Sequence, residues 1–363
     1  MRTLSIRPSC SLLALCAGLA RAQSPSVVER DFVARNVRFA SGDSLSALTI
    51  HYRTLGQPRR DAAGVVRNAV LVLHGTTGSG AQFLSRSFAG ELYGRGQPLD
   101  TSVYFVVLPD GIGHGRSSRP SEGLHARFPR YTYDDMVDAQ HRLLVEGLGV
   151  THLRLVMGTS MGGMHSWVWG ERYPTFMDGI VPLASVPTAI VGRNRMLRRM
   201  AMDDIRTDPS WRGGDYSAQP PGLRAALQIL WVMTSAPLVQ HHDAPTREAA
   251  DSIITTWLDA RFRSMDANDM LYAFDASRDY DPQPMLDRIV APVLAINSAD
   301  DQVNPPELGL MERLMLRVKH GRYVLLPITP QTRGHGTHTV AAVWKQPFAE
   351  FLASLPALPE LHQ

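Results

Sequence analysis

Residues 153–170 read LRLVMGTSMGGMHSWVWG, and this stretch carries the strongest indication of the fold. An apolar run, residues 155–157, ends at Gly158, where the G-x-S-x-G pentapeptide of residues 158–162 begins. After the pentapeptide, apolar residues recur at helical spacing. A strand, a sharp turn and a helix form the context in which this pentapeptide projects its serine from the top of a sheet. The stretch predicts that Ser160 is a nucleophile on such a turn; a glycine-rich turn with a buried serine is the alternative.

Two apolar runs upstream of Ser160 predict strands that are buried on both faces, because neither run alternates with polar residues. They are residues 68–73 (NAVLVL) and 103–108 (VYFVVL). The first run ends in a glycine-rich loop, residues 74–78 (HGTTG). A loop in this position is where an oxyanion hole is built from backbone N–H groups. An ordinary turn between a strand and a helix is the alternative.

Polar residues follow two further predicted strands, residues 292–296 and 323–326. Asp300 and Asp301 come after the first of these strands, and His335 and His338 after the second. The chain order serine, acid, histidine is the order expected on this fold. A serine hydroxyl needs a neutral imidazole to take its proton, and the imidazole needs a carboxylate to orient it. The residues alone leave open which acid and which histidine take part.

The remaining pattern predicts an α/β fold with a mostly parallel, doubly wound sheet, because strands alternate with helical stretches. An N-terminal hairpin is expected around residues 33–52, and a strand at residues 180–183 follows the serine. Residues 187–286 contain no strand-like run. Amphipathic stretches there predict helices at residues 194–204, 222–233 and 246–265. We therefore expect a helical cap over 187–286, inserted into a core made of 23–186 and 287–363.

The first 22 residues have the pattern of a signal peptide. Arg2 and Arg7 precede an apolar stretch, residues 11–20, that is too short to span a bilayer as a mature helix, and an A-x-A site ends at Ala22. The mature chain would start near Gln23 and would be secreted or periplasmic, with no stable membrane anchor. A lipoprotein, processed at Cys16, is the disfavoured alternative.

Composition limits the classes of function. Hydrophobic residues make up 44% of the 363 residues, which suits a large core, and the formal net charge is only +3. The arginines are scattered, so no basic block predicts a nucleic-acid partner. Both cysteines, Cys10 and Cys16, lie in the predicted signal peptide, which leaves the mature chain without a thiol nucleophile or a cysteine metal site. No cofactor or metal is implied, and the oligomeric state is left open, a homodimer included.

Several stretches together resemble one family. These are residues 68–71 (NAVL), 128–140, 160–164 (SMGGM), 201–211 (AMDDIRTDPSW) and 301–307 (DQVNPPE). Through them the chain resembles the α/β-hydrolase fold family and, within it, the homoserine O-acetyltransferase group. The resemblance implies that Asp301 is the acid and His335 the base. It also implies that the backbone N–H groups of Thr76 and Met161 form the oxyanion hole.

The chain departs from that group at two places. Gly336 follows His335 where the group usually has an aspartate that helps to hold the amino group of homoserine. The loop at residues 110–117 is more similar to ester hydrolases. The sequence therefore predicts an exported serine hydrolase that cleaves an ester or similar acyl bond of a small molecule through an acyl-serine intermediate. An O-acyltransferase of the homoserine O-acetyltransferase kind is the first alternative, and a non-catalytic binding module on the same scaffold is the second.

Overall fold

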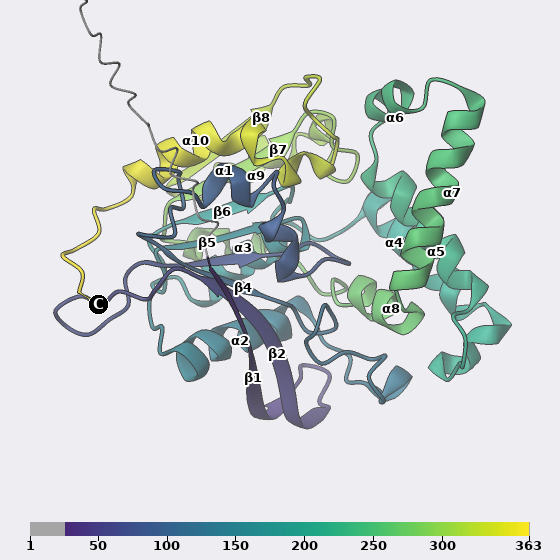
Figure 1. Ribbon diagram of the computed structural model, residues 1–363, viewed down its shortest axis with the longest axis horizontal. Coiled ribbons are helices and arrows are strands. Elements are labelled where there is room, and N and C mark those ends of the chain that lie inside the picture. The colour runs from purple at the N-terminus through teal and green to yellow at the C-terminus, as the bar shows by residue number, and fades with distance from the viewer. Residues whose placement is uncertain (1–25, 363) are drawn as a thin grey trace, which may run out of the picture.

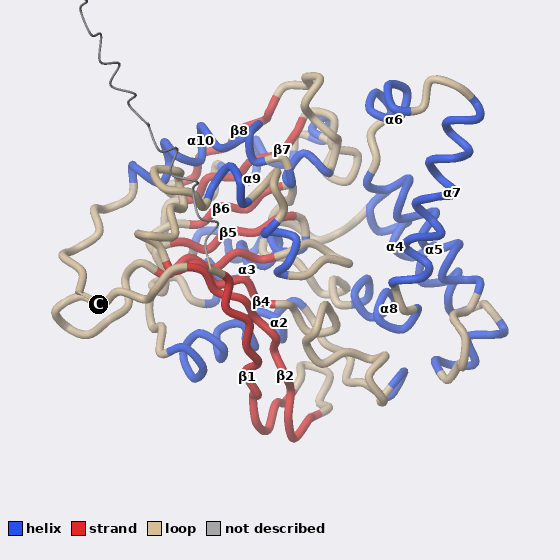
Figure 2. The backbone as a smooth tube through the Cα atoms, viewed as in Figure 1, coloured by secondary structure: helices blue, strands red, loops and turns tan. Residues whose placement is uncertain are grey.

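The computed structural model describes residues 26–362, so the predicted signal peptide and both cysteines lie outside the described residues. Eight strands form one sheet in the order β1-β2-β4-β3-β5-β6-β7-β8. The strands from β4 to β8 in this order run parallel, whereas the β1–β2 hairpin and the β2–β4 pair are antiparallel. Figures 1 and 2 show the hairpin extending beyond the rest of the sheet. The mostly parallel sheet predicted from the sequence is thereby confirmed.

The strands of the sheet centre are buried on both faces. In β3, β4 and β5 every residue is buried. Leu71 and Leu73 pack into the hydrophobic cluster on one face of the sheet, while Val70 and Val72 pack into the cluster on the other. This alternation explains the continuous apolar runs in the sequence. The strands are β1 (Val27–Arg38), β2 (Ser44–Leu55), β3 (Ala69–Leu73), β4 (Phe105–Pro109), β5 (Leu155–Thr159), β6 (Ile180–Leu183), β7 (Val293–Ser298) and β8 (Gly321–Leu326).

Helices cover both faces of the sheet, as a doubly wound fold requires. Helices α2 (Tyr133–Arg142), α3 (Met161–Arg172) and α9 (Leu310–Met315) contribute to the larger hydrophobic cluster. Helices α1 (Ala89–Leu92) and α10 (Ala341–Ser354) contribute to the cluster on the opposite face. A π-helical turn at Leu143–Gly147 continues α2 directly.

Between β6 and β7 the chain forms five α-helices and no strand. Figures 1 and 2 show these helices, drawn in teal and green in Figure 1, on one side of the sheet. Three of them match the helices expected from the sequence, whereas α6 and α8 were not expected. Helix α6 is short and has no buried residue, so no amphipathic pattern marks it in the sequence. Helix α8 is buried on nearly all sides, so it too lacks the polar face that an amphipathic pattern needs. The five helices are α4 (Gly192–Arg206), α5 (Pro221–Thr234), α6 (Pro237–Asp243), α7 (Arg247–Ser264) and α8 (Ala267–Asp275).

Within residues 26–362 no single helix has both the length and the hydropathy needed to cross a bilayer. Helices α5 and α6 reach those values only when taken together, and they are bent by 105° relative to each other.

Candidate active site

Ser160 lies on a strained turn between β5 and α3. Its backbone has φ 55° and ψ −115°, a conformation that costs free energy in a residue other than glycine. The two glycines of the pentapeptide are required by close packing. A Cβ atom on Gly158 would lie 2.1 Å from the carbonyl oxygen of Gly162, and one on Gly162 would lie 2.0 Å from that of Leu73. The turn that the pentapeptide predicts is therefore present, and it holds Ser160 at the carboxyl end of the sheet.

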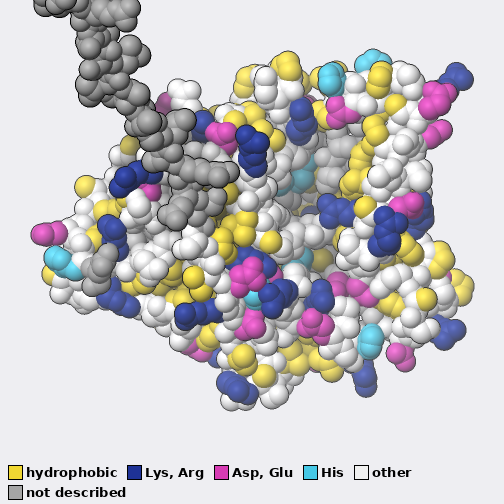
Figure 3. All heavy atoms as spheres, in the orientation of Figure 1, with side chains coloured by type: hydrophobic (Ala, Val, Ile, Leu, Met, Phe, Trp, Pro, Cys, Tyr) yellow, Lys and Arg dark blue, Asp and Glu magenta, His cyan; other side chains and the backbone are white. Residues whose placement is uncertain are grey.

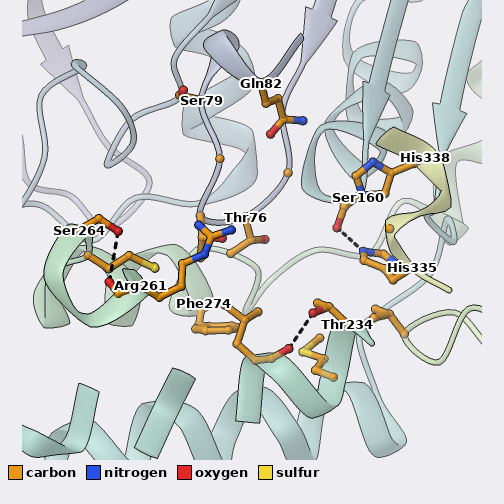
Figure 4. A pocket seen from close by; sticks show the side chains of 18 of the residues that line it. Thr76, Ser79, Gln82, Ser160, Thr234, Arg261, Ser264, Phe274, His335 and His338 are labelled. Atoms are coloured by element: carbon orange, nitrogen blue, oxygen red, sulfur yellow. Dashed lines mark hydrogen bonds between the residues drawn. The ribbon is translucent and has the colours of Figure 1, made fainter. Parts of the chain in front are cut away.

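Three side chains form a hydrogen-bonded series at this edge of the sheet. The Oγ atom of Ser160 lies 2.8 Å from Nε2 of His335, and Nδ1 of His335 lies 2.9 Å from Oδ2 of Asp301. Figure 4 shows Ser160 and His335 pointing toward each other, with a dashed line marking this hydrogen bond. Asp301 follows β7 and His335 follows β8, so parallel strands bring together residues that are 175 positions apart in the chain. With Nδ1 protonated, Nε2 is free to accept the proton of the serine.

The environment of Asp301 keeps it ionised. Burial acts to raise the pKa of its carboxyl group, but the His335 imidazole and the hydrogen bonds from His335, Asn304 and the backbone N–H of Val303 outweigh burial. The pKa of Asp301 therefore lies below its ordinary value. A buried carboxylate that remains charged can hold the imidazole tautomer and stabilise the imidazolium that forms during catalysis.

The two competing residues have other positions. Asp300 accepts hydrogen bonds from the Ser298 hydroxyl at 2.5 Å and from the Gly334 backbone N–H at 2.9 Å. It therefore holds the loop that carries His335 and has no such bond to an imidazole. His338 lines the same cleft, and burial, with the nearby His335 adding to the effect, lowers its pKa to about 3. His338 is therefore neutral at neutral pH.

The residues predicted to form the oxyanion hole lie beside Ser160. Met161 is the first residue of α3, so its backbone N–H cannot bond within the helix. Thr76 lines the cleft together with Ser160 and His335. The Gly75 carbonyl, which shares a peptide group with the Thr76 N–H, contacts Nδ1 of His74 at 2.8 Å and accepts from the Gly78 N–H at 2.9 Å. These contacts fix the orientation of that peptide, as a preorganised oxyanion hole needs.

The cleft lined by Ser160 and His335 has a volume of about 770 Å³ and lies between the sheet and four of the five helices, α4, α5, α7 and α8. Figure 3 shows the surface hollowed between these two parts. Three arginines, Arg119, Arg198 and Arg261, line this cleft, and within the described residues no aspartate or glutamate does. Sequence reasoning missed these arginines. A signal was nevertheless present for Arg198, because residues 198, 201, 202 and 205 form the buried stripe of α4 and Arg198 is the only charged member.

The methionines of α4 and α5 occupy three environments. Met233 lines the cleft, and Met202 is buried in the core without lining it. Met196 and Met200 are exposed on the outside of α4. In the described part of the chain, no group of three or more histidine, cysteine, aspartate or glutamate side chains is placed to hold a metal ion.

A family model for the alpha/beta hydrolase fold matches residues 68–314. The chain belongs to the α/β-hydrolase fold family. The match spans β3 to α9 and includes the pentapeptide and Asp301. This membership agrees with the resemblance carried by the sequence motifs.

Relatives found by sequence are named as acyltransferases. A probable acyltransferase from Methanothermobacter thermautotrophicus is 29% identical over 286 residues, which cover 78% of this chain and 86% of that protein. A homoserine O-acetyltransferase from Moorella thermoacetica is 38% identical over 212 residues, which cover 52% of this chain and 54% of that protein. The chain thus spans about half the length of this relative and of several other homoserine O-acetyltransferases that it matches.

Solved structures of two kinds share the fold. Esterase E22 superposes with a TM-score of 0.77 at 21% identity, covering 90% of this chain and 100% of that one. A homoserine O-acetyltransferase from Bacillus anthracis superposes with a TM-score of 0.77 at 22% identity, covering 91% of this chain and 99% of that one. At these identities the likeness shows the fold alone.

Proposed function

We propose that this protein is a serine-dependent acyl-transfer enzyme that acts on small-molecule esters through an acyl-Ser160 intermediate. The observation that carries the proposal is the hydrogen-bonded series of Ser160, His335 and Asp301 at the floor of the cleft. Each of the three has the geometry that its role requires, since both contacts are within hydrogen-bond distance. A non-catalytic binding module would have no need of this arrangement on a strained turn.

The proposed reaction has two halves. Ser160 Oγ attacks the ester carbonyl while Nε2 of His335 takes its proton, and the backbone N–H groups of Thr76 and Met161 hold the oxyanion. His335 then gives that proton to the departing alcohol, which leaves an acyl-serine. In the second half His335 deprotonates an acceptor hydroxyl, whose oxygen attacks the acyl carbon; the bond from that carbon to Ser160 Oγ breaks, and His335 returns the proton to Ser160 Oγ. Asp301 orients His335 and stabilises its cation throughout.

We propose an alcohol as the acceptor, which makes the enzyme an O-acyltransferase. The names of the sequence relatives support this alternative better than they support hydrolysis, which the sequence by itself favours. Transfer to water remains the second candidate, and one observation favours it. Gly336 lines the cleft directly after His335 and offers no side chain to a bound amino group. The same observation argues against homoserine as the alcohol.

The test measures where the acyl group goes. Purified protein is mixed with 4-nitrophenyl acetate, and the intact mass is measured during turnover and compared with that of the Ser160→Ala variant. We expect one acetyl group on the wild-type protein and none on the variant. Turnover without acetylation of Ser160 contradicts the proposal.

Acceptors are then compared in the same assay. Homoserine, glycerol and simple hydroxy acids are added, and O-acetylated products are separated from free acetate. A parallel reaction uses acetyl-CoA as the donor. Products that contain only acetate, at every acceptor concentration, would establish hydrolysis instead of transfer.

We also propose that the protein is exported, on the strength of the predicted signal peptide alone. N-terminal sequencing of the protein from an expressing bacterium should give a start near Gln23. A start at Met1 would remove this part of the proposal.

A further inference from the structure

We propose that the cleft selects esters that carry a carboxylate, and that Arg198 is the residue that binds it. The inference rests on the proposed function, because it names the substrate class of the same site. The carboxylate lies on either the acyl part or the alcohol part of the ester, and two pairs of substrates distinguish these positions.

Arg198 is a buried cation without an anion. It lies on α4, its exposed fraction is 2%, and it lines the cleft that contains Ser160. Its Nε atom donates to Oδ1 of Asn194 at 2.9 Å and its Nη1 atom to Oγ of Ser277 at 3.2 Å. Both partners are neutral. Among residues 26–362 no carboxylate oxygen lies within 4 Å of its guanidinium nitrogens.

Burial of a guanidinium group is unfavourable unless a negative charge lies nearby. Phe274 lies 5.4 Å below the guanidinium carbon, so the ring face adds some cation–π stabilisation and holds the group in place. The hydrogen bonds found in the described chain use Nε and Nη1 only. Nη2 therefore remains available for a ligand in the cleft. A fixed, planar guanidinium group with unused donor capacity suits a carboxylate.

The rest of the cleft supports an anionic ligand. Arg119 already has acidic neighbours, since its Nε lies 3.2 Å from Glu122 and 3.9 Å from Asp269. Arg261 lies over the Trp257 ring at 5.6 Å and points into the cleft in Figure 4. Among residues 26–362 no acidic side chain lines the cleft, whereas three arginines do, and this composition favours an anionic ligand. One buried guanidinium balances one negative charge, so a carboxylate fits better than a phosphate dianion.

The experiment compares matched pairs of esters that differ in one carboxylate. One pair is phenyl acetate and 3-carboxyphenyl acetate, in which the charge is on the alcohol part. The other is 4-nitrophenyl hexanoate and 4-nitrophenyl hydrogen adipate, in which the charge is on the acyl part. We expect wild-type kcat/KM to favour the charged member of one pair by about 10- to 100-fold, the range expected for a hydrogen-bonded charge.

Variants assign that preference to Arg198. Arg198→Met should remove most of the preference, and Arg198→Lys should keep part of it. Arg199→Met is the matched control, because Arg199 is on the same helix but is exposed and paired with Asp203 at 2.6 Å. The control should keep the full preference. Equal rates within both pairs for the wild-type protein, or a preference unchanged in a folded Arg198→Met variant, overturn the inference.

Inhibition of the wild-type protein gives a second measurement in case Arg198→Met fails to fold. If the alcohol pair shows the preference, 3-hydroxybenzoate should compete with the neutral ester at least about 10-fold more strongly than its methyl ester does; if the acyl pair shows it, adipate should compete at least about 10-fold more strongly than hexanoate. Equal inhibition by the two compounds of the relevant pair also overturns the inference. Failure of the proposed function is distinguishable from both results, because it shows as turnover that survives Ser160→Ala.

Discussion

The edge of the sheet and the five helices that face it obey different constraints. At the sheet edge, the fully buried strands β5 and β7 lead into Ser160 and the loop of Asp301, and close backbone packing permits only glycine at positions 158 and 162. The helices carry exposed apolar side chains, such as Met196 and Leu238, which are 66% and 62% exposed. Rigid strands suit the reacting groups, which need precise geometry. The helices are less constrained, so substitutions there can change which substrate the cleft accepts.

The largest expected effect is on the reacting oxygen itself. Ser160→Ala should lower kcat/KM by about four to six orders of magnitude, because no other group can form the acyl intermediate. Circular dichroism and the urea midpoint should match those of the wild-type protein. By contrast, Met233→Ala on the helical side of the cleft should change kcat/KM by only about 10-fold or less. Comparable losses of kcat/KM for the two variants would contradict the view that the sheet edge holds the reacting groups and the helices affect only substrate choice.

The second-largest expected loss of activity is at the carboxylate that contacts His335. Asp301→Asn should lower kcat by about 10³- to 10⁴-fold, because an asparagine favours the wrong tautomer of His335. Asp300→Asn should reduce kcat much less, since Asp300 holds the backbone of Gly334. Likewise, His335→Ala should lower kcat far more than His338→Ala does. If Asp300→Asn or His338→Ala has the larger effect, the assignment of Asp301 and His335 is wrong.

Glycine substitutions compare the packing of the two regions. Gly162→Ala should reduce the free energy of unfolding by about 3 kcal/mol or more, because the new Cβ would meet the Leu73 carbonyl oxygen at 2.0 Å. Gly192, at the start of α4, has φ +56° and open space around it, so Gly192→Ala should cost only about 1 kcal/mol of backbone strain. Urea unfolding measures both, and a similar cost at the two positions would contradict the difference in packing.

The smallest expected effect is on the pH dependence of stability. Burial lowers the pKa of His338 to about 3 in the folded chain, whereas an unfolded histidine titrates near 6.5. The unfolded state therefore binds more protons between these values, so His338 destabilises the fold progressively as the pH falls from about 6.5 toward 3.

The variant His338→Gln should make the loss of unfolding free energy between pH 7 and pH 5 less steep. His242 is exposed, so His242→Gln is the control and should leave the slope unchanged. A His338→Gln variant with the wild-type slope would show that burial does not lower the pKa of the His338 imidazole.

The sequence alone predicted the sheet well because each central strand is a short apolar run followed by glycine or a polar residue. It also predicted Ser160 as the nucleophile, since the pentapeptide is typical of one kind of turn. It could not by itself choose between Asp300 and Asp301 or between His335 and His338. Those pairs are close in sequence, and the family resemblance was needed to prefer one member of each. In the structure, Asp301 contacts the imidazole of His335, and Asp300 contacts the backbone of the same loop.

What the sequence determined by itself was local: the burial of the strands, the turn at Ser160 and the order of the three polar residues. These follow from apolar periodicity and backbone sterics, which act over a few residues. Only the tertiary structure decided that Arg198, from a helix expected merely to pack, lines the same cleft as Ser160 and has no anionic partner among the described residues. The reason is physical, because the charge balance of a cleft depends on side chains that converge from distant segments, and no local pattern records that convergence.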